Sequence, residues 1–125
     1  TSTNGVDWLR ENISCIKPIN DLEATARPCV IFDADSGKYL MWYSRRDLVN
    51  FRVEAKHGYR GGYAESFDGT DWIRMDTKFG VDVSPDGWDS EAIAYPYVTQ
   101  IRNRKIMFYN GNGFGRTGFG YAVGM

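Results

Sequence analysis

Two glutamates at matching positions are the residues of this 125-residue chain that are best suited to act together in catalysis. Glu23 lies in the run Asp-Leu-Glu-Ala-Thr-Ala-Arg-Pro-Cys-Val, and Glu91 lies in Asp-Ser-Glu-Ala-Ile-Ala-Tyr-Pro-Tyr-Val. Each glutamate therefore stands five residues before a proline, between the same aspartate and alanines. Cleavage of a glycosidic bond needs two carboxyl groups that flank the bond, one protonated and one ionised. This pattern makes Glu91 the candidate general acid and Glu23 its candidate partner.

The two glutamate segments belong to a longer internal repeat, which has to be recognised before any single motif is interpreted. Further blocks recur in the same order, namely 4–8 with 68–72, 40–44 with 106–110, and 62–64 with 120–122. A residue that is present in every copy of a repeat more often packs or caps than reacts. A structural role therefore remains the alternative for both glutamates.

The repeat predicts short antiparallel strands joined by tight turns, such as the Asp-Gly turn at 68–69. We expect strands over 28–33, 39–44, 61–66, 71–75, 95–101, 105–109 and 118–123. The run 28–33 is apolar throughout and is expected to be buried on both faces. One more strand is expected over 6–12, after the Asn4-Gly5 turn.

Four-stranded antiparallel units repeated along a chain are typical of β-propeller blades. We therefore expect an all-β, β-propeller-like fold in a single domain, 1–125, with one repeat over about 1–64 and another over about 65–125. One continuous four-stranded blade is expected at about 28–76, and three strands of a second blade at about 95–124.

The second predicted blade lacks a fourth strand, and two blades cannot close a ring, for which about four are needed. Exposed sheet faces and edges favour association. We therefore expect either a homo-oligomer, in which residues 6–12 of a neighbouring chain complete the second blade, or the remainder of a longer propeller.

Composition argues against several other classes of protein. Fifteen basic and 16 acidic residues nearly cancel, so no broad basic field is available for nucleic acid. With a single histidine and no Cys-X-X-Cys pattern, no metal or other cofactor is expected. No apolar run is long enough to cross a membrane and no signal peptide is recognised, which leaves the localisation undetermined. Cys15 and Cys29 are expected to be buried thiols rather than a disulfide.

Several side chains could bind a substrate beside the glutamates. Arg27 could meet a sugar hydroxyl or carboxylate, or it could pair with a glutamate. Trp42, Trp88 and Tyr95, together with Tyr97, could stack on sugar rings, although packing between blades is the alternative for most of them.

Two loops are also of interest. The Gly-rich run 111–118 is not a phosphate loop, because it lacks the Gly-Lys-Ser/Thr ending and no helix is expected after it. It is expected to be an inter-strand loop in which Asn112 and Arg116 could touch a ligand. The run 45–58 is expected to be a solvated loop, and contact with a partner or an anionic sugar is the alternative.

Three runs of sequence, 27–44, 62–72 and 88–98, resemble the five-bladed β-propeller glycoside hydrolases, a group that includes arabinanases, β-xylosidases and invertases. The resemblance covers about two blades and implies carboxylates that point into a central funnel, with Glu91 as the acid. It implies a domain that acts on or binds carbohydrate. The family's Asp-Pro pattern is replaced by Arg27-Pro28 and Tyr95-Pro96. This departure favours the alternative, a non-catalytic sugar-binding or assembly module.

Overall fold

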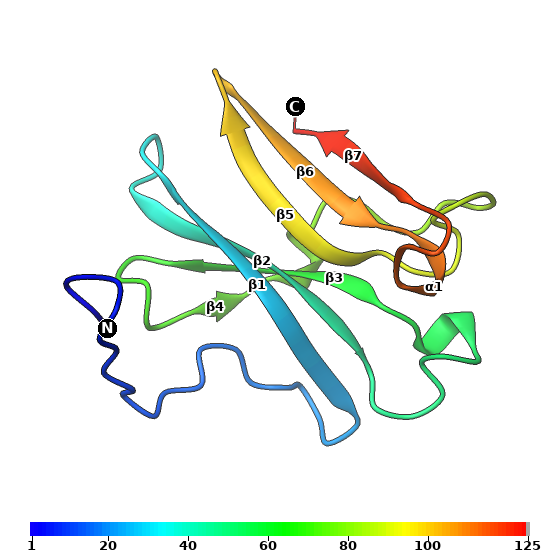
Figure 1. The fold of residues 1–125 in the computed structure, drawn as a ribbon, viewed down its shortest axis with the longest axis horizontal. Helices are drawn as coiled ribbons and strands as arrows, with labels where there is room; N and C mark the ends of the chain where they lie inside the picture. The colour runs from blue at the N-terminus through cyan, green and yellow to red at the C-terminus, as the bar shows by residue number, and fades with distance from the viewer. Residues whose placement is uncertain (125) are drawn as a thin grey trace.

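A computed structural model, which describes residues 1–124, confirms the all-β prediction, with two antiparallel sheets and few helices. Strands in the first sheet run in the order β1-β2-β3-β4, and those in the second run β5-β6-β7 (Figure 1). Their bounds are Glu23–Asp33 for β1, Lys38–Asp47 for β2, Arg60–Ser66 for β3, Ile73–Arg74 for β4, Ala94–Ile101 for β5, Arg104–Asn110 for β6 and Phe119–Val123 for β7. Short helical turns lie at Ala55–His57 (η1), Asp76–Lys78 (η2) and Asn112–Gly115 (α1). We call the first sheet blade 1 and the second blade 2.

Every strand expected between 28 and 123 is present, but the burial of the first was predicted wrongly. β1 begins at Glu23, earlier than its apolar run, and its register with β2 shifts between Ala26 and Cys29. Only one face of β1 is covered by blade 2. Val30 and Phe32 lie on the other face and remain 45% and 55% exposed.

The strand predicted over 6–12 is not formed. The Asn4-Gly5 turn does form, and the Asn4 side chain accepts the backbone N–H groups of Val6 and Asp7, at 2.9 Å each. Beyond the turn, Leu9 and Thr1 exchange two backbone hydrogen bonds of 2.8 and 2.7 Å, with no further ladder. A strand needs a partner of several residues, and none lies beside 6–12 in the described chain.

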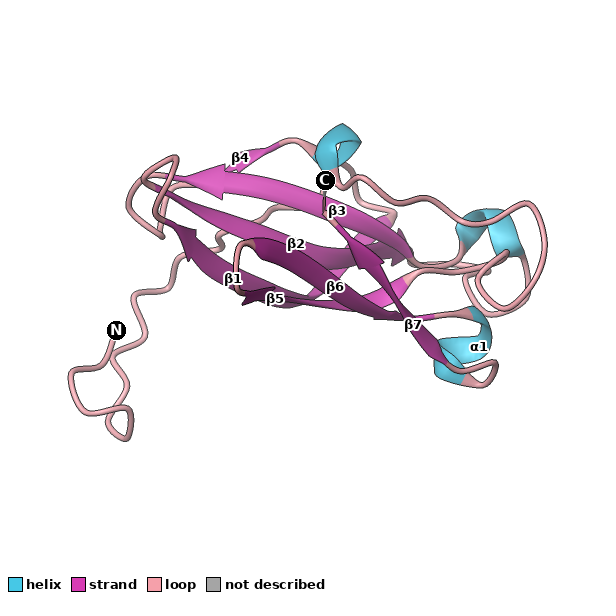
Figure 2. Ribbon diagram, turned by 90° about the horizontal axis from the view of Figure 1, so that it is seen from above, coloured by secondary structure: helices cyan, strands magenta, loops and turns pink. Residues whose placement is uncertain are grey.

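The core lies between the two blades, which are stacked as layers when the molecule is seen from above (Figure 2). Alternate side chains of each strand point to one face of its sheet. The core is formed by the buried residues Leu40, Trp42, Tyr63, Phe79, Ile93, Val98, Met107 and Tyr109. A smaller cluster on the far side of blade 1 contains Met41, Tyr43 and Ala64. The larger cluster fixes the two blades relative to each other.

Polar contacts also join the blades. The Lys105 ammonium lies 2.7 Å from a carboxylate oxygen of Asp33, across the blade junction. The thiol of Cys29 exchanges hydrogen bonds with the backbone of Val98. Both cysteines are free, and Cys15 is exposed, contrary to the expectation that it is buried. None of the helices in residues 1–124 is long and apolar enough to cross a membrane.

Candidate functional site

A pocket of about 320 Å³ lies at the end of the molecule where β5 begins and β2 ends. Two loops that break the repeat form it, the 45–58 loop of blade 1 and the Gly-rich 111–118 loop of blade 2. Its lining residues are Phe51, Arg52, Val53, Glu54, Ala55, Gly58, Tyr59, Glu91, Ala92, Gly113, Phe114 and Arg116. Among the residues predicted from the sequence, Glu91 and Arg116 lie in this pocket.

Three aromatic rings and two arginines organise its wall. The ring centroids of Phe51 and Phe114 lie 6.2 and 5.6 Å from that of Tyr59, in edge-to-face arrangements. Arg46 places its guanidinium 3.8 Å from the centre of the Phe51 ring, and Arg52 lies 5.2 Å from the same centre. Edge-to-face rings and cation–π contacts add roughly 0.5–1.5 kcal/mol each to apolar burial. The 45–58 loop is therefore ordered against the rest of the site, not merely solvated.

Arg27 and Tyr95 lie beside this cluster and contact each other across the two blades. The Arg27 guanidinium lies 4.8 Å from the centre of the Tyr95 ring, which packs edge-on against Tyr59 at 5.3 Å. Both residues have left-handed backbone, with φ of 57° and 58°, and each precedes the proline of its strand. Non-glycine residues in this region cost of order 1–3 kcal/mol, and such strain clusters at functional sites. Burial and the neighbouring Tyr59 hydroxyl raise the pKa of Tyr95.

Glu91 is exposed, and its backbone is held by Asn112. The Asn112 side-chain oxygen accepts the N–H groups of Glu91 and Ala92, at 2.7 and 3.1 Å. Its amide nitrogen donates to the Gly87 carbonyl at 3.1 Å, and Asn112 is only 6% exposed. The predicted ligand-binding amide thus holds the segment that carries Glu91, while the carboxylate itself faces the pocket.

Glu23 has a different environment from Glu91. Its two carboxylate oxygens each accept a hydrogen bond of 2.7 Å from Arg74, and one accepts the Ile19 N–H at 2.9 Å. Burial tends to raise the pKa of Glu23, but the hydrogen bonds and positive charge of Arg74 outweigh this and leave the pKa below its ordinary value. Arg74 is also bound to Asp76 at 2.7 Å. The structure does not bring Glu23 into the pocket that Glu91 lines.

The two predicted tryptophan platforms are packed inside the protein. Trp42 is 8% exposed and meets Tyr63 edge-on in the core between the blades. Trp88 stacks on Tyr109 with ring centroids 5.3 Å apart, and it lies so close to Gly120 that a Cβ there would approach it to 2.6 Å. Packing between and within blades, the alternative stated for these residues, is what the structure shows.

Sequence reasoning did not select the residues Phe51, Tyr59, Phe114, Arg46 and Glu54. The signal available was the failure of the repeat over 45–58, where the first copy carries a long insertion rich in arginine and aromatic residues. A loop that departs from its repeat is free to diverge for binding. No cluster of three or more His, Cys, Asp or Glu within residues 1–124 is arranged to hold a metal ion.

Comparison with known proteins gives relatives by sequence but no matching family model. The chain is 43% identical over 123 residues to the uncharacterized protein MT1551 of Mycobacterium tuberculosis strain CDC 1551 / Oshkosh. It is 42% identical to the uncharacterized protein Rv1502 of strain ATCC 25618 / H37Rv. Each match covers 98% of this chain, which spans 38% of the length of either relative.

Two solved structures share the fold. One, described as a complex of BT0996 and RGII, matches 88% of this chain and 35% of its own with a TM-score of 0.65 and 21% identity. The other, described as "Glycoside hydrolase", matches 91% and 30% with a TM-score of 0.59 and 16% identity. At these identities the likeness shows the fold alone. It agrees with the propeller-like arrangement of two antiparallel blades.

Proposed function

We propose that this domain binds a carbohydrate in the pocket between the 45–58 and 111–118 loops. The observation that carries this proposal is the composition of the pocket wall, in which aromatic rings alternate with arginines and a free carboxylate. Rings such as those of Phe51 and Phe114 offer apolar surface to sugar C–H groups, while Arg52 and Arg116 can donate to hydroxyl or carboxylate oxygens. A neighbour of the same fold is described as a glycoside hydrolase, which supports a carbohydrate as the ligand class.

A glycan array probed with the labelled chain tests the proposal directly, followed by titration calorimetry with the best soluble sugar. Phe114→Ala is expected to weaken binding at least tenfold, because Phe114 is only 42% exposed and meets two other rings of the wall. Phe67→Ala removes a 73% exposed ring on the β3–β4 turn and should leave binding unchanged. An array without any bound sugar, or equal effects of both variants, would contradict the proposal.

Hydrolysis of a glycoside is the second candidate, and it rests on the two carboxylates, Glu91 and Glu54, that line this one pocket. A hydrogen bond from Lys56 holds the pKa of Glu54 below its ordinary value, so Glu54 is the ionised member at neutral pH. Glu91 is then the proposed acid, as the sequence indicated. Glu23 remains a proposal only as a structural carboxylate, because Arg74 occupies both of its oxygens.

A panel of nitrophenyl furanosides and pyranosides separates the two candidates. If the domain is a hydrolase, Glu91→Gln should lower kcat by a factor of 100 or more, since general acid catalysis contributes roughly 10²–10⁴-fold. Glu11→Gln, an exposed change outside the pocket, is the control. Sugar binding without turnover in the parent chain would leave only the binding function.

A further inference from the structure

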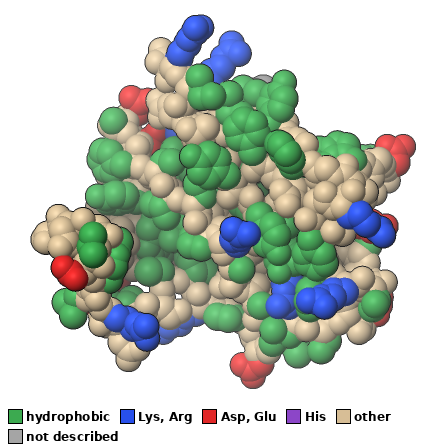
Figure 3. Space-filling model, viewed as in Figure 1, with side chains coloured by type: hydrophobic (Ala, Val, Ile, Leu, Met, Phe, Trp, Pro, Cys, Tyr) green, Lys and Arg blue, Asp and Glu red, His purple; other side chains and the backbone are tan. Residues whose placement is uncertain are grey.

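The two blades meet through residue positions that recur, unused, on the outer surfaces of the molecule. Blade 1 presents Cys29, Leu40, Trp42 and Tyr63 to blade 2. The repeat places Tyr97, Ile106, Phe108 and Tyr121 at the same positions of blade 2. Tyr63 is 7% exposed, whereas Tyr121, its counterpart, is 66% exposed. We call this second set the outer face of blade 2; Figure 3 shows hydrophobic side chains gathered over β5, β6 and β7.

The opposite side of the same interface recurs as well. Blade 2 receives blade 1 with Val98, Met107, Tyr109 and Ala122. The repeat places Val30, Met41, Tyr43 and Ala64 at these positions of blade 1, and we call them the outer face of blade 1. Val98 is 3% exposed and its counterpart Val30 is 45% exposed.

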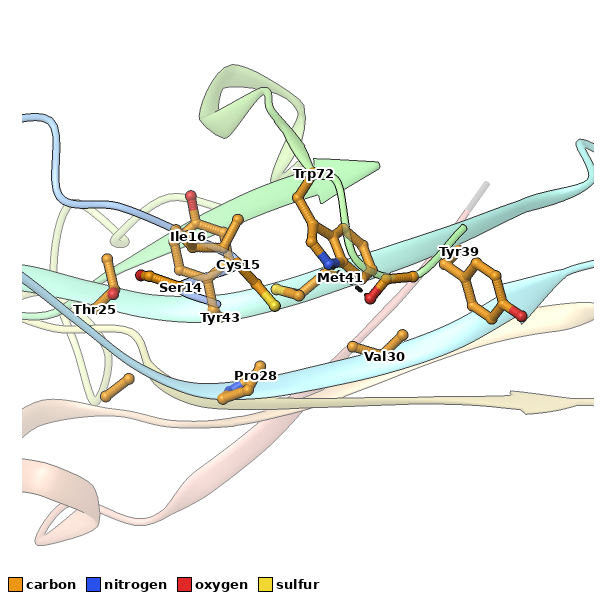
Figure 4. Close-up of a pocket in the computed structure, with 12 residues that line it drawn as sticks. Ser14, Cys15, Ile16, Thr25, Pro28, Val30, Tyr39, Met41, Tyr43 and Trp72 are labelled. Carbon is orange, nitrogen blue, oxygen red and sulfur yellow. Dashed lines mark hydrogen bonds between the residues drawn. The ribbon is translucent and has the colours of Figure 1, made fainter. Parts of the chain in front are cut away.

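A groove of about 490 Å³ marks the outer face of blade 1. Figure 4 shows Val30, Met41 and Tyr43 on its floor, with Trp72 on one side and the segment around Cys15 and Ile16 near it. The lining is mainly apolar, and no described part of the chain fills it. Apolar surface that is contiguous and rimmed by polar groups is typical of a contact with another protein.

The N-terminal segment supplies a third recurring feature. Ser2–Asn12 repeats Ser66–Asp76, with Ser, Gly, Asp, Trp and Arg at the same places. The side-chain oxygens of Ser2 and Ser66 accept the N–H of Gly5 and Gly69, at 2.9 and 2.8 Å. The indole N–H groups of Trp8 and Trp72 donate to the carbonyls of the same two glycines, at 3.2 and 3.1 Å.

In this comparison the N-terminal segment is a hairpin end without a blade. The Thr1–Leu9 pair repeats the Glu65–Ile73 pair that begins the β3–β4 ladder. Blade 2 ends at β7, whose outer edge has no neighbouring strand in the described chain. Arg10, the counterpart of Arg74, would lie beside Ala122 if residues 9–12 paired with β7 as β4 pairs with β3.

We propose that a second copy of this chain docks head to tail on blade 2. Its Leu9–Asn12 adds the fourth strand beside β7, and the outer face of its blade 1 packs on the outer face of blade 2. Both contacts arise from one placement, because the N-terminal hairpin directly precedes blade 1 in the repeat. The backbone groups of Leu9 exchange Thr1 for Val123 of the neighbouring copy, as in donor-strand pairing.

Charge complementarity supports this occupant over an unrelated protein. In blade 1 the carboxylate of Glu23 is held by Arg74 from β4. Glu91 occupies the position of Glu23 in blade 2, is exposed, and forms no ion pair with any residue in 1–124. Docking brings Arg10 of the second copy to the place of Arg74, so that Glu91 acquires the guanidinium its counterpart already has.

Light scattering after size exclusion is the first test, on the chain at tens of micromolar. A closed ring needs about four to eight blades, so two to four copies are expected. Tyr97→Ser with Tyr121→Ser should give monomers with an unchanged circular dichroism spectrum, because both side chains are already exposed in the single chain. Phe67→Ser with Val53→Ser is the matched control and should stay assembled. A monomeric parent chain, or equal dissociation of both double variants, overturns the proposal.

A charge exchange tests the pairing of Arg10 with Glu91 specifically. Arg10→Glu and Glu91→Arg are each expected to raise the dissociation constant at least tenfold, and the two changes together should restore most of the loss. Additive losses in the double variant overturn the proposed register. Because the readout is assembly, its failure is distinct from a failure of sugar binding, which the glycan array measures.

Discussion

At the scale of single residues, the ion pair of Glu23 with Arg74 is the strongest electrostatic feature of blade 1. The pair is bidentate, and the side chains are only 5% and 17% exposed. Removing one partner of a fully buried pair costs about 3–5 kcal/mol, but part of this pair reaches solvent. We therefore expect Glu23→Gln to lower the free energy of unfolding by about 2 kcal/mol, measured by urea titration. Glu11→Gln, at the surface, should change it by less than about 0.5 kcal/mol.

A second residue-scale prediction concerns Asp33 and acid stability. The Lys105 ammonium and then the Ser36 hydroxyl hold the pKa of Asp33 down from 3.8 to about 2. A carboxyl group with a depressed pKa stabilises the fold above its unfolded pKa, and this contribution is lost as the pH falls through the folded value. The parent chain should therefore lose stability between about pH 4 and pH 2, measured by urea midpoints at each pH. Asp33→Asn should flatten this profile, whereas a profile as steep as that of the parent would contradict a role for Asp33.

At the scale of elements, close packing of glycine against aromatic rings holds the strands of blade 2. A Cβ on Gly120 of β7 would come within 2.6 Å of the Trp88 ring. Overpacking of this kind costs typically about 1–3 kcal/mol, so Gly120→Ala should lower the free energy of unfolding by that amount. Gly124 follows the same strand, and a Cβ there would meet its nearest neighbour at 3.4 Å. Gly124→Ala is therefore the control, and an equal loss in both variants would show that the Trp88 contact is not the cause.

The strands were predictable from the sequence because alternation and Asp-Gly turns are local signals. The repeat also revealed which strands are equivalent. It did not reveal that 6–12 lacks a ladder, because a strand depends on its partner and not only on its own residues. The pocket was partly predictable, since Glu91 and Arg116 stood out by type. Phe51 and Phe114 did not, because only the folded loops bring residues so distant in sequence into contact.

At the scale of the whole molecule, each copy contributes two blades, so whole copies can close only rings with an even number of blades. The five-bladed ring implied by the family resemblance would need a longer chain, and the curated relatives are longer than this one. Both arrangements use the same outer faces. They differ in whether the neighbouring blades belong to the same chain, and this difference has a thermodynamic consequence.

Stability that depends on a second copy depends on protein concentration, because mass action favours the assembled state. The thermal midpoint of the 125-residue chain should therefore rise by a few degrees for each tenfold increase in concentration. The midpoint of the Tyr97→Ser, Tyr121→Ser variant should be lower and independent of concentration, since its outer face no longer supports the contact. Differential scanning calorimetry from about 5 to 500 µM makes the measurement. If the parent midpoint is also constant over this range, the two blades are stable without a neighbour, and the exposed faces must be covered by other parts of a longer chain or remain free.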